Sequence, residues 1–189
     1  MRLGVFGGTF DPPHIGHLIV ASDVCAVLDL DRVVFVPSAA PPHKRGRVNA
    51  SAEQRLEMVR AAVAADPRFE VDDLELRREG ESYSVDTLRE FRAREPDAEL
   101  FFIIGADQLR EMDRWRQPEE VARLATLVVM SRAGDEADGH VAFPVRAVAV
   151  TRIDLSATRI RERIERGEPI RYLVPDAVRE IIEREKLYR

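Results

Sequence analysis

Short apolar runs alternate along the chain with longer segments in which apolar residues recur every three or four positions. The short runs are typical of buried strands, and the longer segments are typical of amphipathic helices. We expect strands at residues 2–6, 32–36, 100–105, 126–131 and 145–150, with a further extended segment at 69–77. We expect helices at residues 14–28, 51–66, 84–95, 106–112, 118–124, 156–167 and 175–186. This alternation predicts an α/β fold with a mainly parallel sheet that helices cover on both faces.

Several helix ends carry sequence signals. Ser51 is followed three residues later by Gln54, the spacing of a capping box. Ser156 is expected to cap the helix that ends at Gly167, and Pro118 stands at a first helical position, which proline favours. Residues 37–49 and 132–144 are expected to be polar loops, and the second of them is predicted to be mobile.

Composition narrows the class of protein. The chain has 189 residues, 45% of them hydrophobic and 33% charged, which fits one globular domain over residues 1–189. Its net charge of −5 argues against a nucleic-acid-binding protein, which would need a basic surface. The single Cys25 excludes an internal disulfide, and the most apolar stretch, residues 18–30, is too short and too polar to span a bilayer. We therefore expect a cytoplasmic protein that is not bound to a membrane.

Candidate ligand-binding and catalytic residues follow the first predicted strand directly. They lie in the sequence Gly7-Gly8-Thr9-Phe10-Asp11-Pro12-Pro13-His14-Ile15-Gly16-His17. Two glycines allow a tight turn and a close approach of the backbone to a ligand. The helix that follows presents N–H groups and a positive dipole end, which suits a phosphate. His14 and His17 are three residues apart and are expected to project from one face of the first turn, with Gly16 leaving room between them.

Taken alone, this segment leaves several interpretations open. A pair of glycines after a strand is often only a turn, and two histidines can lie on a helix surface. A zinc site needs three or four ligands, and only His43 and His140, both in predicted loops, are left to complete one. The segment matches neither the dinucleotide-binding glycine pattern nor the Walker A loop, which disfavours hydride transfer and P-loop hydrolysis.

The same segment resembles the signature of the nucleotidyltransferase superfamily, (T/H)-x-G-H preceded by Gly-Gly-Thr-Phe-Asp-Pro. Further stretches are similar to bacterial nicotinate-nucleotide adenylyltransferases and follow the family order. They are Pro41-Pro42-His43-Lys44, Ser82-Tyr83-Ser84-Val85-Asp86-Thr87-Leu88, Gly105-Ala106-Asp107 with Trp115, Ser156-Ala157-Thr158-Arg159-Ile160-Arg161 and Tyr172-Leu173-Val174-Pro175. Ala157 stands where that family has a second serine, which puts one hydroxyl contact in doubt.

The resemblance implies a Rossmann-like, doubly wound fold and a specific reaction. The AMP moiety of ATP passes to the 5′-phosphate of nicotinate mononucleotide, and pyrophosphate leaves. The incoming phosphate attacks, so positioning and charge neutralisation matter more than a protein nucleophile. The resemblance implies Mg²⁺ held through the ATP phosphates rather than by a protein metal site. It implies small-molecule substrates as the partners, and a monomer or a small homo-oligomer.

The resemblance also assigns roles to individual residues. His14 and His17 would be catalytic, through contacts to the ATP phosphates and to charge that develops on the α-phosphate. Trp115 would stack on the pyridinium ring of the acceptor, and main-chain N–H groups near Tyr83 and Ser84 would hold its carboxylate. The expected ATP-binding residues are Gly8, Thr9, Phe10, His14, His17, Ser156, Thr158 and Arg159, and the expected acceptor-binding residues are Lys44, Tyr83, Ser84, Asp107 and Trp115.

Two alternatives remain at this point. The first is an adenylyltransferase of the same superfamily that acts on phosphopantetheine or nicotinamide mononucleotide. The Ser82–Leu88 stretch and Trp115 argue against it. The second is a non-catalytic nucleotide-binding domain on the same scaffold, which the intact His14, His17 and Lys44 disfavour.

Overall fold

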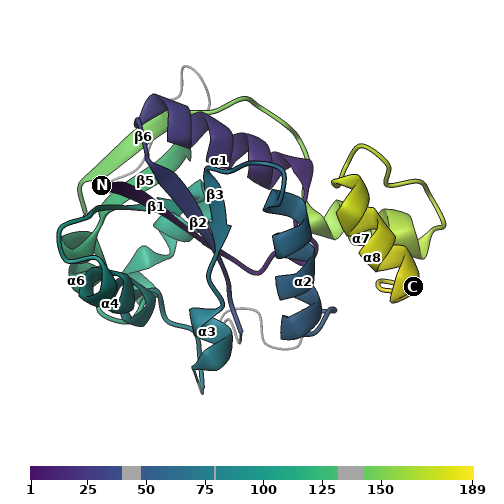
Figure 1. The fold of residues 1–189 in the computed structure, drawn as a ribbon, viewed down its shortest axis with the longest axis horizontal. Helices are drawn as coiled ribbons and strands as arrows, with labels where there is room; N and C mark the ends of the chain where they lie inside the picture. The colour runs from purple at the N-terminus through teal and green to yellow at the C-terminus, as the bar shows by residue number, and fades with distance from the viewer. Residues whose placement is uncertain (40–47, 79, 132–142) are drawn as a thin grey trace.

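The computed structural model describes residues 1–39, 48–78, 80–131 and 143–189 (Figure 1). Its strands are β1 (Arg2–Gly8), β2 (Arg32–Pro37), β3 (Phe69–Val71), β4 (Glu99–Ile104), β5 (Thr126–Ser131) and β6 (Val145–Ala149). Its α-helices are α1 (Ile15–Val27), α2 (Ala52–Val63), α3 (Leu74–Arg77), α4 (Ser84–Arg94), α5 (Ala106–Arg110), α6 (Pro118–Leu124), α7 (Ala157–Glu165) and α8 (Asp176–Arg184). A short 3₁₀ helix, η2, covers Met112–Arg114. In these ranges, no helix is long and apolar enough to cross a membrane.

The six strands form one parallel sheet in the order β3-β2-β1-β4-β5-β6. The chain builds the sheet outward from β1 to β3, returns to the centre, and then builds outward from β4 to β6. The connections therefore reverse direction between β1 and β4, which creates a topological switch point at their carboxyl ends. This arrangement confirms the predicted doubly wound α/β fold, with every pairing parallel.

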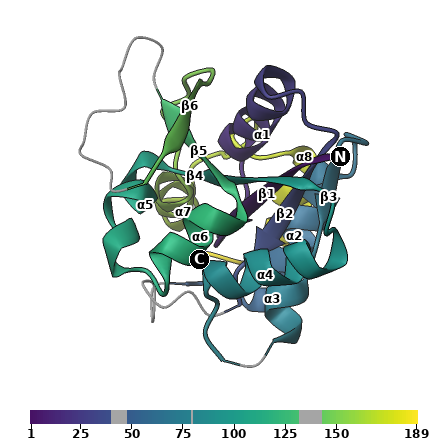
Figure 2. The same cartoon turned by 90° about the vertical axis from the view of Figure 1, so that its left-hand side faces the viewer.

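Helices cover both faces of the sheet (Figures 1 and 2). Alternate residues of a strand point to opposite faces. Phe101 and Ile103 of β4 pack with the buried residues of α1, α2, α7 and α8. Leu100 and Phe102, on the other face, pack with those of α3, α4, α5 and α6. The strands are buried on both faces, which explains why they appear in the sequence as continuous apolar runs rather than as alternating ones.

The predicted elements are observed with ends shifted by at most three residues, except in two places. The expectation of an extended segment over residues 69–77 is wrong beyond Val71, because α3 begins at Leu74. The Asp72 carboxylate accepts a hydrogen bond from the Leu74 N–H at 2.9 Å, and this contact turns the chain into a helix. The helix expected over residues 106–112 instead ends at Arg110 and is followed by η2.

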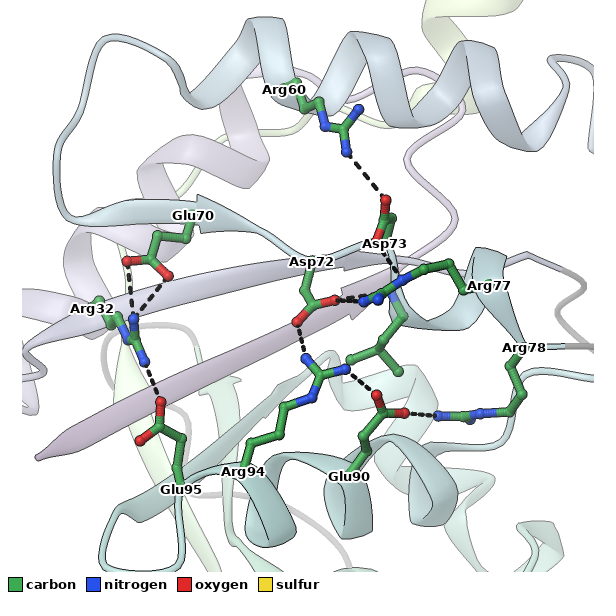
Figure 3. A network of polar contacts seen from close by, with 11 residues as sticks. Arg32, Arg60, Glu70, Asp72, Asp73, Arg77, Arg78, Glu90, Arg94 and Glu95 are labelled. Carbon is green, nitrogen blue, oxygen red and sulfur yellow. Dashed lines mark hydrogen bonds and ion pairs between the residues drawn. The ribbon is translucent and has the colours of Figure 1, made fainter.

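An ionic network joins the outer strands to α3 and α4 (Figure 3). Arg94 donates to Asp72 at 2.5 Å and also pairs with Glu90, while Arg32 pairs with Glu70 and Glu95. Single exposed ion pairs contribute little to stability, but a network that shares its arginines restricts several elements at once. This network fixes the positions of α3 and α4, two helices whose residues reach the site described next.

Candidate active site

A cleft of about 1120 Å³ opens at the carboxyl ends of β1 and β4, where the sheet has its switch point. Ligands of open parallel sheets bind at such a point. Most of the residues singled out in the sequence line this cleft. They are Gly8, Thr9, Phe10, His14, His17, Tyr83, Ser84, Asp107, Trp115, Ser156 and Thr158. Lys44 lies outside the described residues, as does most of the 132–144 loop.

The turn after β1 brings the backbone close to the cleft. Phe10 has a positive φ of 51°, which folds its ring back over Gly8. A Cβ atom on Gly8 would lie 2.8 Å from Cζ of that ring, so a larger residue would displace the aromatic side chain. Phe10 itself is buried and packs edge-on against Phe6 and His17. The second glycine is therefore required by the packing of this turn.

The two histidines lie together at the start of α1. Their rings stack with centroids 3.7 Å apart and an angle of 22° between their planes. The space above Gly16 is filled by His14 itself, because a Cβ atom there would lie 3.0 Å from Nδ1 of its imidazole. The glycine between the histidines thus makes room for the His14 ring.

Hydrogen bonds determine which nitrogen of His17 carries the proton. The main-chain N–H of His14 donates to Nδ1 of His17 at 3.1 Å, so that nitrogen is an acceptor. In the neutral ring, the proton therefore lies on Nε2. His17 lines the cleft, and its Nε2–H is the group that can donate to a phosphate oxygen there.

His14 lies in a different environment. It is 7% exposed, and its Nδ1 is buried without a hydrogen-bond partner in the described structure. Burial lowers its pKa from 6.5 to about 4, so the ring is neutral at pH 7. A buried polar atom with no partner is costly, and this one lies against Gly16.

We predict that His14 stays neutral down to about pH 4 in the absence of nucleotide. The measurement is an NMR titration of its imidazole shifts, with a His14→Gln variant to assign the signal. Between pH 6.5 and about 4 the unfolded chain takes up a proton that the folded chain does not. Stability should therefore fall as the pH falls through this window, and His14→Gln should remove that dependence. A His14 pKa near 6.5 would contradict the prediction.

Asp11 holds the turn after β1 to distant parts of the chain. Its carboxylate is 3% exposed and accepts hydrogen bonds from Asn49 N at 2.8 Å, Ala50 N at 3.1 Å and the Tyr188 hydroxyl at 2.7 Å. Burial and the Asp11 charge both raise the pKa of Tyr188, which stays a hydrogen-bond donor. Arg161 donates to the main-chain oxygen of Asp11 at 2.8 Å. The turn is therefore anchored by α7 and by the segment after α8.

The start of α7 forms a second wall of the cleft. The Ser156 hydroxyl accepts a hydrogen bond from Arg159 N at 3.3 Å and caps the helix, as predicted. Ser156 and Thr158 line the cleft, whereas the Arg159 side chain is exposed and pairs with Asp154 outside the lining. Arg161, which is mostly buried, lines the cleft instead. The ATP-binding role given to Arg159 remains a prediction, and Arg161 is the arginine better placed for it.

The start of α4 forms the opposite wall. The N–H groups of Asp86 and Thr87 both donate to the Tyr83 carbonyl, so the N–H groups of Ser84 and Val85 precede the hydrogen bonds of the helix. The Arg116 guanidinium lies 4.9 Å from the centre of the Tyr83 ring. This wall combines main-chain donors, a helix dipole and a cation, and it suits a negatively charged group.

Trp115 and Asp107 lie between these walls. Trp115 is half-buried and packs edge-on against Phe102 of β4, with ring centroids 6.2 Å apart. It also lines the cleft, so it combines a structural contact with an accessible aromatic surface. Asp107 is exposed in the first turn of α5 and can accept hydrogen bonds from hydroxyl groups.

The described residues of this site do not form a cluster of metal ligands. Over the described part of the chain, no group of three or more histidine, cysteine or acidic side chains is arranged to hold a metal ion. A divalent ion that acts here would be held mainly by the phosphates of its ligand and by water, which is a common arrangement for Mg²⁺ with nucleotides.

Comparison with known proteins agrees with this geometry. The family model described as cytidylyltransferase-like matches residues 5–163. The chain belongs to the cytidylyltransferase-like family. A relative from Thermus thermophilus, named probable nicotinate-nucleotide adenylyltransferase, is 50% identical over all 189 residues and is itself covered completely. A relative of the same name from Geobacillus thermodenitrificans is 44% identical over 99% of this chain and 86% of its own length. The resemblance seen in the sequence motifs is thereby confirmed.

A solved structure shares the fold of this cytidylyltransferase-like chain. It is the Plasmodium falciparum nicotinic acid mononucleotide adenylyltransferase complexed with NaAD, which superimposes with a TM-score of 0.83 at 16% identity. The match covers 99% of this chain and 97% of that one. At this identity the comparison establishes the shared fold.

Sequence reasoning missed several residues that the fold of this family member brings to the site. Arg161 belongs to the quoted Ser156–Arg161 stretch and could have been found from it. Glu75 and Thr87 line the cleft from α3 and α4, and Arg55 reaches the turn after β1 from α2. Thr87 belongs to the quoted Ser82–Leu88 stretch and could have been found from it. Glu75 and Arg55 have no local sequence signal, because their contacts join separate segments.

Proposed function

We propose that the protein transfers the adenylyl group of ATP to the 5′-phosphate of nicotinate mononucleotide and releases pyrophosphate. The observation that carries this proposal is a single cleft that contains the histidine pair, the start of α7, the start of α4 and Trp115. The first two features suit a triphosphate, and the last two suit an acidic pyridine nucleotide. Relatives 43–50% identical over the full chain carry the corresponding name.

The chemistry follows from the placement of donors. The acceptor phosphate oxygen attacks the α-phosphorus of ATP, and the bond from that phosphorus to the bridging oxygen breaks, so that pyrophosphate leaves. The Nε2–H of His17 donates to oxygens of the α-phosphate as their charge grows. His14 supplies a neutral ring beside it, and the start of α7 with Arg161 receives the β- and γ-phosphates. When bound, Mg²⁺ neutralises charge on the phosphates and comes with the ATP.

Selectivity for an acid over an amide has a physical basis at α4. The N–H groups of Ser84 and Val85 can donate to a carboxylate, and the helix dipole favours its charge. A carboxamide would place an NH₂ group against these donors and would leave them unpaired. We therefore propose that nicotinate mononucleotide is preferred over its amide.

The decisive test measures pyrophosphate release with ATP and Mg²⁺ for three acceptors side by side. Nicotinate mononucleotide should be turned over much faster than nicotinamide mononucleotide or phosphopantetheine. Preference for another acceptor would refute nicotinate mononucleotide as the substrate, but it would leave the transfer of the adenylyl group from ATP in place. ATP binding with no release from any acceptor would indicate a non-catalytic nucleotide-binding domain.

We predict that Trp115→Ala raises the KM for nicotinate mononucleotide about tenfold, with a smaller effect on the KM for ATP. The substitution removes the aromatic surface on which the pyridinium ring would stack, an interaction of about 1–2 kcal/mol. Steady-state kinetics with each substrate varied in turn measures it. Tyr172→Ala, which removes an aromatic that is 80% exposed outside the cleft, is the control. An unchanged KM would leave Trp115 with a packing role only.

A cytoplasmic location is part of the same proposal. Cys25, the only cysteine, is buried and unpaired, which fits a reducing compartment.

A further inference from the structure

Arg55 is the largest fully buried side chain of the described structure, with 1% exposure, and it lies on α2 outside the cleft lining. Its guanidinium donates three hydrogen bonds, all to main-chain carbonyl oxygens. The distances are 2.7 Å to Thr9, 3.2 Å to Ala39 and 3.4 Å to Ala50. Burial lowers its pKa from 12.5, and the charge of Asp11 acts in the opposite direction. Burying a guanidinium is costly, so its retention calls for a role beyond stability.

The Thr9 and Ala39 carbonyls that Arg55 holds belong to segments that lead to different walls of the site. Thr9 is in the turn after β1, beside the histidines. Ala39 follows β2, and its N–H donates to the Ser82 hydroxyl oxygen at 3.1 Å. Ser82 comes directly before Tyr83 and Ser84, whose segment forms the wall assigned to the acceptor. One side chain therefore connects the phosphate turn to the acceptor turn through two intervening contacts.

The chain of contacts continues to a buried carboxylate. Glu75 is 7% exposed and accepts a hydrogen bond from the Thr87 hydroxyl at 2.6 Å, and it also interacts with the Ser82 hydroxyl. Burial raises the pKa of Glu75, while the hydroxyl contacts oppose that shift. Ser82 precedes the first turn of α4, and Thr87 lies at the end of that turn. The Glu75 carboxylate contacts both hydroxyls and therefore holds the turn in place. The path from Thr9 to Thr87 thus runs through hydrogen bonds and the main chain of Ala39.

We propose that Arg55 is a positioning residue that, together with Glu75, sets the distance and angle between the phosphate turn and the acceptor turn. This inference rests on the proposed adenylyl transfer, in which two substrates held on opposite walls must meet in line. A misalignment of about 1 Å can lower the rate about a hundredfold while each substrate still binds its own wall. The effect of disturbing these contacts should therefore appear in kcat rather than in either KM.

The test compares Arg55→Lys, Glu75→Gln and the double variant with the unaltered protein. Lysine keeps the positive charge of Arg55, but its single ammonium group cannot donate to three separate carbonyls as the planar guanidinium does. Glutamine keeps the volume of Glu75 but replaces one acceptor oxygen by an NH₂ donor. We expect each single variant to lower kcat about ten- to a hundredfold, with both KM values changed less than about threefold. The double variant should lose little more than the worse single variant, because the two residues act on one alignment.

Arg92→Lys is the matched control. Arg92 also donates three hydrogen bonds to main-chain carbonyls, those of Pro96, Ala98 and Leu124, but it lies away from the cleft. It should lower the melting temperature, because three carbonyls lose their donor, and leave kcat unchanged. A kcat loss in Arg92→Lys that matches the loss in Arg55→Lys would mean that loosened packing causes both, and it would overturn the proposal.

Other outcomes separate this inference from the proposed function. An unaltered protein with no turnover refutes the proposed function. Turnover that persists at full kcat in folded Arg55→Lys, a raised KM for one substrate with unchanged kcat, or fully multiplicative losses in the double variant would each refute the positioning role. If Arg55→Lys fails to fold, Glu75→Gln alone carries the test, because its volume is conserved.

Discussion

His17→Ala should lower kcat for adenylyl transfer by about a hundred- to a thousandfold, the cost typical of losing one donor to a developing oxyanion. His17 lines the cleft, and its Nδ1 accepts from the His14 main chain, so the neutral ring carries its donor on Nε2. The fold should persist, since His17 is only partly buried and lies in the first turn of α1. Initial rates of pyrophosphate release at saturating substrates measure the effect.

Two further variants at this position distinguish the catalytic contact from the structural one. In His17→Asn, the side-chain oxygen can still accept from the His14 N–H, but no donor reaches as far as Nε2 did. In His17→Gln, the amide N–H reaches farther and can replace part of the donor. We expect the asparagine variant to be as slow as alanine and the glutamine variant to recover part of the rate. Unchanged turnover in His17→Asn would remove this histidine from the mechanism.

Asp11→Ala should give the largest loss of stability of any single substitution at the site, about 3–5 kcal/mol. It would leave the N–H groups of Asn49 and Ala50 and the Tyr188 hydroxyl without their acceptor, and the last two of these contacts are buried. It would also remove a negative charge that favours the buried Arg55 guanidinium. Chemical denaturation measures the free energy of unfolding.

Two control variants set the scale for this loss of stability. Tyr188→Phe removes one of the three donors and should cost about 1–2 kcal/mol. Asp97→Ala, at an exposed position, should stay within about 0.5 kcal/mol of the unaltered protein. A loss for Asp11→Ala no greater than that for Asp97→Ala would show that the buried carboxylate is dispensable.

The sheet and most helices could be predicted from sequence because their signals are local. Continuous apolar runs mark strands buried on both faces, and Ser51 with Gln54 forms the predicted capping box, with Ser51 N to Gln54 Oε1 at 2.9 Å. The sequence pattern does not predict the helix over residues 74–77, because a single side-chain contact from Asp72 starts that helix. A four-residue helix is too short to show a period.

The site could be predicted only in part. The sequence motifs contain most of the residues that line the cleft, because they follow strands whose carboxyl ends meet at the switch point. The neutral state of His14 could not be predicted, because it comes from burial. The contacts of Arg55 and Glu75 could not be predicted either, since they join separate elements of the fold and no motif marks them.

The contact between Asp11 and Tyr188 spans 177 positions of the chain. A ribosome that adds about 5–20 residues each second makes the first of these residues roughly 10–35 s before the second. The strands of the sheet can pair in that interval, but the turn beside the histidines still lacks a donor that its aspartate needs. A nascent chain would thus acquire its framework first and its capacity for chemistry afterwards.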